Sequence, residues 1–400
     1  MKAVLKLYKV NSKAGQYILK SAVIIFVVCC FLSSSLLNVH ATDNLDLDEI
    51  YSEQYKLSGA QKLEDELPKE ARRSIKNIGI DLKDIKSFTK LTPDKVFNEI
   101  FFMIKQQSPI PIKAMCISVS IILLCAVIES MKLSFGERPL SGILSVVSAL
   151  SICIAIIFPI VETISNAAMV IQCSANFMLV YIPVMAGIMV ASGQPVSAAS
   201  YHMMMVIAGE TISQIASRFL VPFLNVFLSV SVVSVLSDKM NLSGICKNIG
   251  VIIKWILSFV MTIFVSLLTM QSIVAGSSDN TGTKAVKFAL NSFVPIVGGA
   301  LSDAFSTVQG CVKLLKSGVG AFGVLAAGVI FIPLILECLM WLLSVNVCAS
   351  IGDIFSLKQI SEMLRAVSRV IGTILAIVLC CMTILTISTV LVLIVGGGLS

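Results

Sequence analysis

Long uncharged apolar runs follow one another through most of the chain after residue 113. The runs at 139–161, 163–209, 255–278 and 370–400 contain no Asp, Glu, Lys or Arg. Each run is long enough for a helix to cross a bilayer, which takes about 20 mostly apolar residues. Shorter runs lie between them. The pattern therefore predicts an all-α fold, a polytopic membrane helical bundle of about 7–10 spans with its main domain at 114–400.

Composition supports this prediction. The chain has 400 residues, of which 56% are hydrophobic and 13% are charged, and its mean hydropathy is +0.94. Soluble domains are about 45–50% apolar and about 25% charged. A water-soluble fold would have too little polar surface, so the lipid bilayer is the expected surroundings of this protein.

The first 41 residues have the order of a signal peptide. Lysines at positions 2–20 precede an apolar core at 22–32, and an acidic run begins shortly after the small residue Ala41. This order predicts cleavage between Ala41 and Thr42. An uncleaved membrane anchor is the alternative, because the apolar stretch is long for a signal peptide. In both cases the residues that follow emerge on the far side of the membrane.

The segment 42–113 is expected to be a small extracytoplasmic helical region. It holds 25 charged residues, whereas the 287 residues after it hold 23. Helices are predicted around 46–57, 69–86 and 93–107, the last of them beginning at a Thr-Pro pair suited to a helix start. The run Ser-Pro-Ile-Pro at 108–111 is expected to be a stiff connector. A region this small has a marginal core, so we expect it to pack on the membrane domain or on a partner.

The membrane domain carries a weak internal similarity. Residues 177–276 and 288–397 align at an offset near 112, with prolines and glycines at matching places. If the similarity is a true tandem repeat, each unit has four apolar segments, which in the second unit are 288–302, 309–329, 330–350 and 370–397. The alternative is chance, because unrelated apolar bundles share Pro and Gly.

Polar residues inside apolar runs are candidates for function, because such residues are costly in a membrane and usually face a cavity or a partner. Glu337 follows Pro333 by four residues, and Asn225 follows Pro222 by three. Glu210 interrupts the apolar pattern near 198–217. For Glu337 a functional role in pore lining, ion handling or subunit contact stands beside a purely structural role within the bundle.

A second group of candidates suggests a broken helix. Pro295 is followed by Gly298 and Gly299, and glycine permits an unwound turn. Asp303 comes soon afterwards and is expected to cap a following helix at 304–316 rather than to act on a ligand.

Catalytic and metal sites are not expected. The chain has two histidines, His40 and His202, and its twelve cysteines form no C-x-x-C pair. A His-rich zinc site or a catalytic His pair is therefore excluded for the mature chain. No cofactor motif is present, and the basic residues form no patch of the kind that binds nucleic acid. The prediction is a protein without catalytic, cofactor or metal site that is not an enzyme.

A family resemblance enters through one run of residues. The stretch from Asn291 to Phe305, NSFVPIVGGALSDAF, resembles the stage III sporulation protein AE family of endospore-forming bacteria, and the layout is similar from roughly residue 90 onward. The resemblance implies a subunit of a complex in the mother-cell membrane around the forespore. With the other stage III sporulation membrane proteins and a forespore-side partner, it would form a secretion-like channel that supports late forespore gene expression. No catalytic motif accompanies the resemblance.

Three classes of function remain open to a test. A non-enzymatic channel-complex subunit requires stable partners and no turnover. A secondary transporter requires a small solute and an essential intramembrane acid, such as Glu337 or Asp303. An intramembrane enzyme requires paired catalytic groups at one depth, and the four aspartates of 114–400 lie at the ends of apolar runs. The first class is the one that the resemblance favours.

Overall fold

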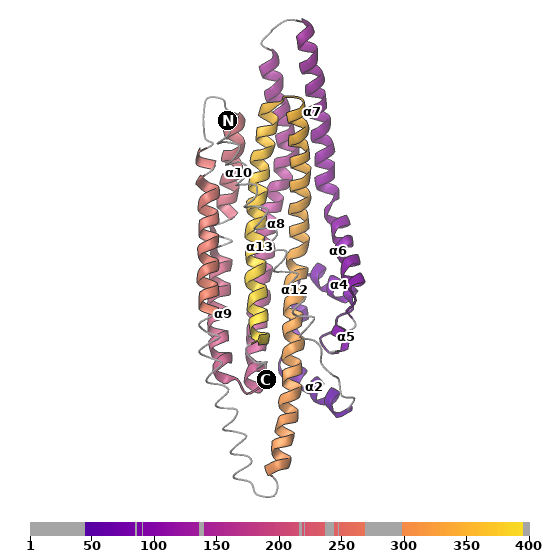
Figure 1. The fold of residues 1–400 in the computed structure, drawn as a ribbon, viewed down its shortest axis with the longest axis vertical. Coiled ribbons are helices and arrows are strands. Elements are labelled where there is room, and N and C mark those ends of the chain that lie inside the picture. Colours follow the sequence, from indigo (N-terminus) through magenta and orange to yellow (C-terminus); the bar gives the residue numbers. More distant parts are fainter. Residues whose placement is uncertain are drawn as a thin grey trace, which may run out of the picture.

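The computed structural model is a long helical bundle (Figure 1). It describes residues 45–84, 86–89, 91–135, 140–215, 218–219, 221–236, 244–246, 248–268 and 298–394. Every regular element in these ranges is a helix, which confirms the predicted all-α class. The signal peptide, its cleavage site at Ala41 and Thr42, and Pro295 lie outside the described residues.

The N-terminal region is built of short helices. They are α2 (Leu45–Leu57), α3 (Lys62–Asp65), α4 (Lys69–Ile78), α5 (Lys86–Thr89) and α6 (Pro93–Gln107). The helix predicted at 69–86 ends earlier, because Gly79 adopts a left-handed conformation with φ +86° and its N–H bonds to the carbonyl groups of Ile75 and Lys76. The helix α6 begins at Pro93 as expected, with an extended Thr92 before it.

The predicted stiff connector at 108–111 is wrong. The helix α7 (Pro109–Phe135) starts directly after α6, and Ser108 between them is itself helical. The Ser108 N–H bonds to the Ile104 carbonyl, and the Ile112 N–H bonds to the Ser108 carbonyl. Proline is tolerated here because the first turn of a helix needs no N–H donor from it.

The remaining helices form the apolar bundle. They are α8 (Leu140–Ala191), α9 (Pro195–Ile215), α10 (Val221–Leu236), α12 (Gly298–Ile354) and α13 (Lys358–Ile394). A further apolar helix covers Gly244–Leu268. In the part of the chain that the structure describes, five helices are long and apolar enough to span a membrane, and Val221–Val233 is a shorter apolar helix. The chain is therefore a multi-pass membrane protein.

Two of these helices are longer than the sequence pattern suggested. The helix α8 passes through Glu162, which divides the apolar runs 139–161 and 163–209, and α12 continues without interruption from 309 to 350. The segments predicted at 309–329 and 330–350 are therefore one helix, so the second unit of the proposed repeat does not have four separate segments. A lone carboxylate does not end a helix when it has polar partners or lies on the surface, so charge spacing overestimates the number of breaks.

The core of the bundle lies around α12, which other helices surround on several sides. The helix packs against α13, α8 and α7, and also against α2, α4 and α6 of the N-terminal region. Its apolar stretch Val308–Ile354 is 47 residues long, and 72% of the most apolar 18-residue segment within it is buried. At about 1.5 Å per residue this stretch is roughly 70 Å long, more than twice a hydrocarbon core of about 30 Å. The N-terminal helices help to cover this excess length, which is the packing expected for a region with a marginal core.

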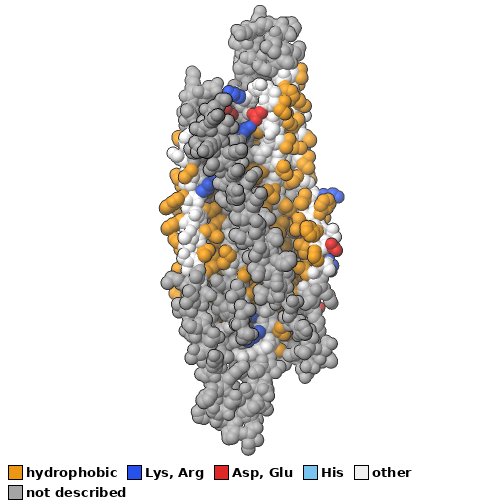
Figure 2. Space-filling model, in the orientation of Figure 1, with side chains coloured by type: hydrophobic (Ala, Val, Ile, Leu, Met, Phe, Trp, Pro, Cys, Tyr) orange, Lys and Arg blue, Asp and Glu red, His pale blue; other side chains and the backbone are white. Residues whose placement is uncertain are grey.

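The outer surface is mainly hydrophobic. Figure 2 shows that hydrophobic side chains dominate the described part of the visible face, and that charged side chains are few and scattered. Such a surface suits lipid and other apolar helices better than water.

Candidate functional site

Glu337 is the intramembrane carboxylate with the most polar partners among the predicted candidates. Its side chain is half-buried on α12. The Thr163 hydroxyl on α8 donates to Glu337 Oε1 over 2.7 Å, and the side chains of Asn166 and Trp341 also interact with the carboxylate. Trp341 is 1% exposed and Thr163 is 1% exposed. The site is therefore a carboxylate held between two long helices by neutral hydrogen-bonding groups.

The Thr163 hydroxyl has a second acceptor within its own helix. Thr163 Oγ1 also lies 3.1 Å from the carbonyl oxygen of Pro159 on its own helix. One hydroxyl proton can serve only one of these acceptors at a time. The carboxylate thus competes with a backbone carbonyl for the same donor. Such a site can hold or release a proton or bind a small cation, and it can also join the helices without further chemistry.

The other predicted residues lie elsewhere in the described part. Glu210 is exposed on α9 and accepts a hydrogen bond of 3.1 Å from Gln214 one turn later. Asn225 is exposed on α10, where its backbone carbonyl accepts from the Ser229 hydroxyl over 2.9 Å. No interaction found for Glu337 involves either residue.

The expectation of a broken helix at 295–303 is corrected in part. The described helix α12 begins at Gly298 and Gly299 and continues without interruption to Ile354. Asp303 therefore lies inside the helix and is not the cap of a new helix at 304–316. Glycine weakens a helix by only about 1 kcal/mol relative to alanine, so Gly298 and Gly299 do not by themselves force a break before Asp303.

The structure also brings together buried polar groups that the sequence pattern did not single out. The ammonium group of Lys316 donates to Gln194 Oε1 over 3.0 Å, although Lys316 is only 4% exposed. Gln309 Nε2 donates to the Ser192 carbonyl over 3.4 Å. Both contacts join α12 to the turn after α8, where Gly193 is left-handed with φ +84°. Carbonyl groups at a helix C-terminus lack partners within the helix, so the Gln309 amide satisfies the Ser192 carbonyl. The positive charge of Lys316 lies close to the same helix end and complements its dipole.

A pair of buried tyrosines lies in the same core. Tyr181 and Tyr201 are 0% and 1% exposed, and neither hydroxyl has a hydrogen-bond partner among the described residues. The Tyr181 ring stacks on Phe177 with 5.7 Å between centroids. Gly323 of α12 leaves the space that the Tyr181 ring fills. The contact between Tyr181 and Phe177 is local, whereas only the tertiary fold brings Gly323 to the Tyr181 ring.

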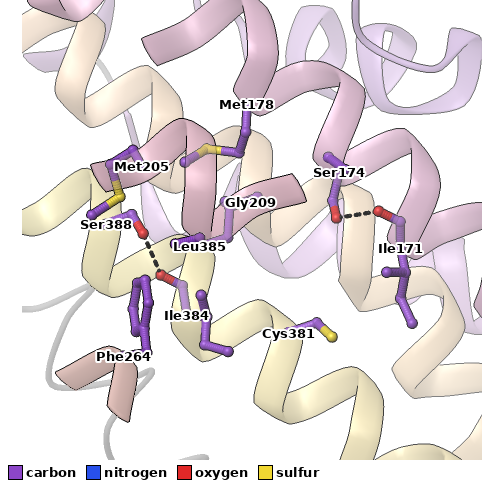
Figure 3. Close-up of a pocket in the computed structure, with 12 residues that line it drawn as sticks. Ile171, Ser174, Met178, Met205, Gly209, Phe264, Cys381, Ile384, Leu385 and Ser388 are labelled. Atoms are coloured by element: carbon purple, nitrogen blue, oxygen red, sulfur yellow. Dashed lines mark hydrogen bonds between the residues drawn. The ribbon is translucent and has the colours of Figure 1, made fainter. Parts of the chain in front are cut away.

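An apolar pocket lies between helices of the bundle (Figure 3). It lies between α8, α9, α13 and the helix 244–268, with Met178, Met205 and Phe264 among its walls. The hydroxyl groups of Ser174 and Ser388 donate to the carbonyl groups of Ile171 and Ile384 in their own helices, over 2.7 and 2.8 Å. The walls therefore present apolar surface, which suits a small apolar group and no charged ligand.

Metal ligands do not gather in the described ranges. No group of three or more His, Cys, Asp or Glu side chains there is placed to hold a metal ion. The ten cysteines within the described ranges are free thiols and most are buried. They act as small hydrophobic residues in the bundle.

The fold and its sparse internal polar contacts define a polytopic α-helical membrane protein. A profile of the family described as Stage III sporulation protein AE matches residues 78–397. The chain belongs to this family of sporulation proteins, which confirms the resemblance seen in the sequence.

A curated relative gives the same family. The chain is 24% identical over 200 residues to "Stage III sporulation protein AE" of Bacillus subtilis (strain 168), and the match covers 50% of each chain. The chain thus spans about half the length of the curated relative it matches. No solved structure matches the chain.

Proposed function

We propose that the protein is a non-enzymatic integral membrane subunit of a sporulation-specific, secretion-like channel complex between mother cell and forespore. It acts in the mother-cell membrane that surrounds the forespore, and it is needed for late forespore development and gene expression. Its partners are the other stage III sporulation membrane proteins and a protein on the forespore side.

The family match over residues 78–397 is the observation that carries this proposal. Two structural features agree with it. The bundle has an apolar outer surface suited to lipid and to other membrane helices. The N-terminal helix α6 exposes Phe97 at 70% and Phe101 at 69%, in a region otherwise rich in charge. Exposed aromatic side chains next to a membrane domain suit contact with a partner protein.

The proposal is tested by deleting the gene in a sporulating host and scoring engulfed forespores for a late forespore reporter. We expect engulfment to finish and late expression to fail, with recovery when the intact gene is restored. Normal late expression and normal spores in the deletion strain would refute the proposal. Co-purification with neighbouring membrane proteins of the same operon would support it independently.

A secondary transporter of a small solute is the second candidate, because Glu337 is an ionisable group held between α8 and α12. A transporter requires that the purified chain alone moves a solute into proteoliposomes, and that Glu337→Gln abolishes the movement. A channel subunit requires neither. If the Glu337→Gln variant restores sporulation as well as the intact chain does, Glu337 has only a structural role.

A further inference from the structure

The two tryptophans of the chain lie in opposite surroundings. Trp341 on α12 is 1% exposed, whereas Trp255 on the apolar helix Gly244–Leu268 is 69% exposed. The Trp255 ring is stacked on the ring of Phe259 one turn later, with 5.6 Å between centroids and 2° between the planes. Phe259 is 53% exposed, so the two rings form one aromatic surface on the outside of the bundle. We refer to these two residues and the exposed Lys254 together as the Trp255 cluster.

The helix that carries the Trp255 cluster has the properties of a helix that faces lipid. Only 17% of its most apolar 18-residue segment is buried within the chain. The exposed hydroxyl groups of Thr262 and Ser266 donate to carbonyl groups of the same helix, over 2.8 Å in both cases. These hydroxyl groups therefore need no partner outside the helix, which makes hydrocarbon around them acceptable.

The Trp255 cluster lies at the start of the uncharged part of this segment. The run 255–278 contains no Asp, Glu, Lys or Arg, whereas Lys247 and Lys254 come just before it. A run of this length is sufficient to cross a bilayer, which takes about 20 mostly apolar residues. Residues at the start of such a run are expected where the hydrocarbon core ends and the headgroups begin.

The chemistry of the Trp255 cluster matches a phospholipid headgroup. An indole combines a large apolar ring with one N–H donor, and tryptophan is therefore enriched at membrane–water interfaces. Lys254 adds a positive charge beside this donor, and it forms no ion pair with an acidic residue of the described ranges. A phosphate group carries negative charge and several acceptor oxygens, so it can accept from both the indole and the ammonium group.

We propose that the Trp255 cluster binds the phosphate of an anionic phospholipid and so fixes the depth of the helix Gly244–Leu268 in the bilayer. The Trp255 N–H and the Lys254 ammonium group donate to the phosphate, and the Phe259 ring lies against the upper part of an acyl chain. Such an anchor is needed because the apolar stretch of α12 exceeds twice the thickness of the hydrocarbon core, so hydrophobicity alone leaves the depth of the bundle open. This inference goes beyond the channel-subunit proposal and does not depend on it.

Fluorescence quenching by brominated lipids tests the depth of the Trp255 ring. The full chain and its Trp255→Phe variant are placed in vesicles of phosphatidylcholine and phosphatidylglycerol, with bromine either near the headgroup or near the end of the acyl chains. The difference between the two proteins isolates the emission of Trp255, and the variant alone reports the buried Trp341 as an internal control. We expect bromine near the headgroup to remove more of the Trp255 emission than bromine near the chain end, and to affect Trp341 little. Stronger quenching from the chain end, or no quenching of Trp255 by either lipid, would overturn the proposal.

The charge of the headgroup is tested in the same vesicles. Brominated phosphatidylglycerol and brominated phosphatidylcholine are compared as quenchers of Trp255 at equal bromine content. One lysine near an anionic membrane surface contributes about 1 kcal/mol, so we expect enrichment of phosphatidylglycerol by up to about fivefold. Lys254→Gln should abolish this preference, whereas Lys83→Gln, a control at an exposed lysine of the N-terminal region, should retain it. Equal quenching by the two lipids in the unsubstituted chain, or a preference that Lys254→Gln retains, would refute binding of an anionic headgroup by the cluster.

A competition experiment separates the lipid from a free anion. Inorganic phosphate is added to the vesicles at constant ionic strength, because salt alone screens the attraction between charges. We expect the preference of Trp255 for phosphatidylglycerol to remain. Loss of the preference would assign the cluster to a soluble anion and would overturn its role as a lipid anchor.

Discussion

Gly323 gives the sharpest test of the packing between α12 and α8. A Cβ atom added at Gly323 would lie 2.8 Å from Cε2, Cζ and Oη of Tyr181. The Tyr181 ring is completely buried and stacked on Phe177, so it has no open space to enter. The substitution Gly323→Ala therefore forces either the ring or the helices apart.

The magnitude follows from two opposing effects. Overpacking a well-filled core costs about 1–3 kcal/mol. Replacing glycine by alanine inside a helix stabilises it by about 1 kcal/mol, which offsets part of that cost. Gly372→Ala on α13 is the matched control, because an added Cβ there meets nothing within 4 Å. The helix contribution is the same for both variants, so their difference isolates the contact with Tyr181.

The assay uses the buried cysteines of the bundle as reporters. A thiol-reactive dye becomes fluorescent as heating exposes these side chains. The midpoint of thermal unfolding can then be compared between the variants at one scan rate. A difference of 1 kcal/mol shifts Tm by about 2–4 °C in chains of 150–250 residues, and by less in a longer chain. We expect Gly323→Ala to melt below the parent chain and Gly372→Ala at or above it. Equal midpoints for the two variants would show that Gly323 does not contact Tyr181 as described.

Three further predictions concern hydrogen bonds and titration. Tyr181→Phe should leave the melting midpoint unchanged or raise it, because the lost hydroxyl has no partner among the described residues; a fall equivalent to about 1 kcal/mol or more would reveal a bond not seen here. Gln194→Leu should destabilise the chain by about 1.5–3 kcal/mol by removing an acceptor from Lys316, whereas Gln194→Glu should retain most of the stability, and the same dye assay compares them. Burial raises the pKa of Tyr55 to about 12 and raises the pKa of Tyr51 as well. The contribution of these two tyrosines to the stability of the N-terminal region should therefore be constant below about pH 10 and fall as pH rises from there toward 12, since the unfolded tyrosines ionise first. Absorbance of tyrosinate should show a late component that becomes smaller, without vanishing, in a Tyr51→Phe and Tyr55→Phe double variant, because Tyr181 and Tyr201 are buried as well. A late component of unchanged size in the double variant would contradict the burial of Tyr51 and Tyr55.

The N-terminal region illustrates how far local sequence reaches. Helices near 46–57 and 93–107 were predictable, because a Thr-Pro start and apolar residues at helical spacing act within a few turns. The early end of α4 also has a local cause, because Gly79 is the residue type that most easily adopts the left-handed conformation of a helix cap. The prediction for the Ser-Pro-Ile-Pro run was wrong because a proline-containing run can either begin a helix or form an extended linker, and its residues alone do not distinguish the two.

The candidate site illustrates the opposite case. Sequence spacing singled out Glu337 as an acid within an apolar run, but Thr163 lies 174 positions away and its contact depends on how α8 crosses α12. Lys316 and Gln194 are 122 positions apart, and nothing local distinguishes this buried lysine from one at a membrane surface.

The sequence alone determined that this is a helical membrane protein of a sporulation family, because hydrophobicity, helical spacing and one distinctive run are properties of the chain itself. The tertiary structure decided where the helices end and which polar groups meet. A charged residue separates two spans only when water reaches it, and whether water or another helix lies beside Glu337 is settled by residues distant in the chain. Contacts with a distant segment accommodate Glu337 within the continuous helix α12, whereas Glu162 lies exposed on the continuous helix α8.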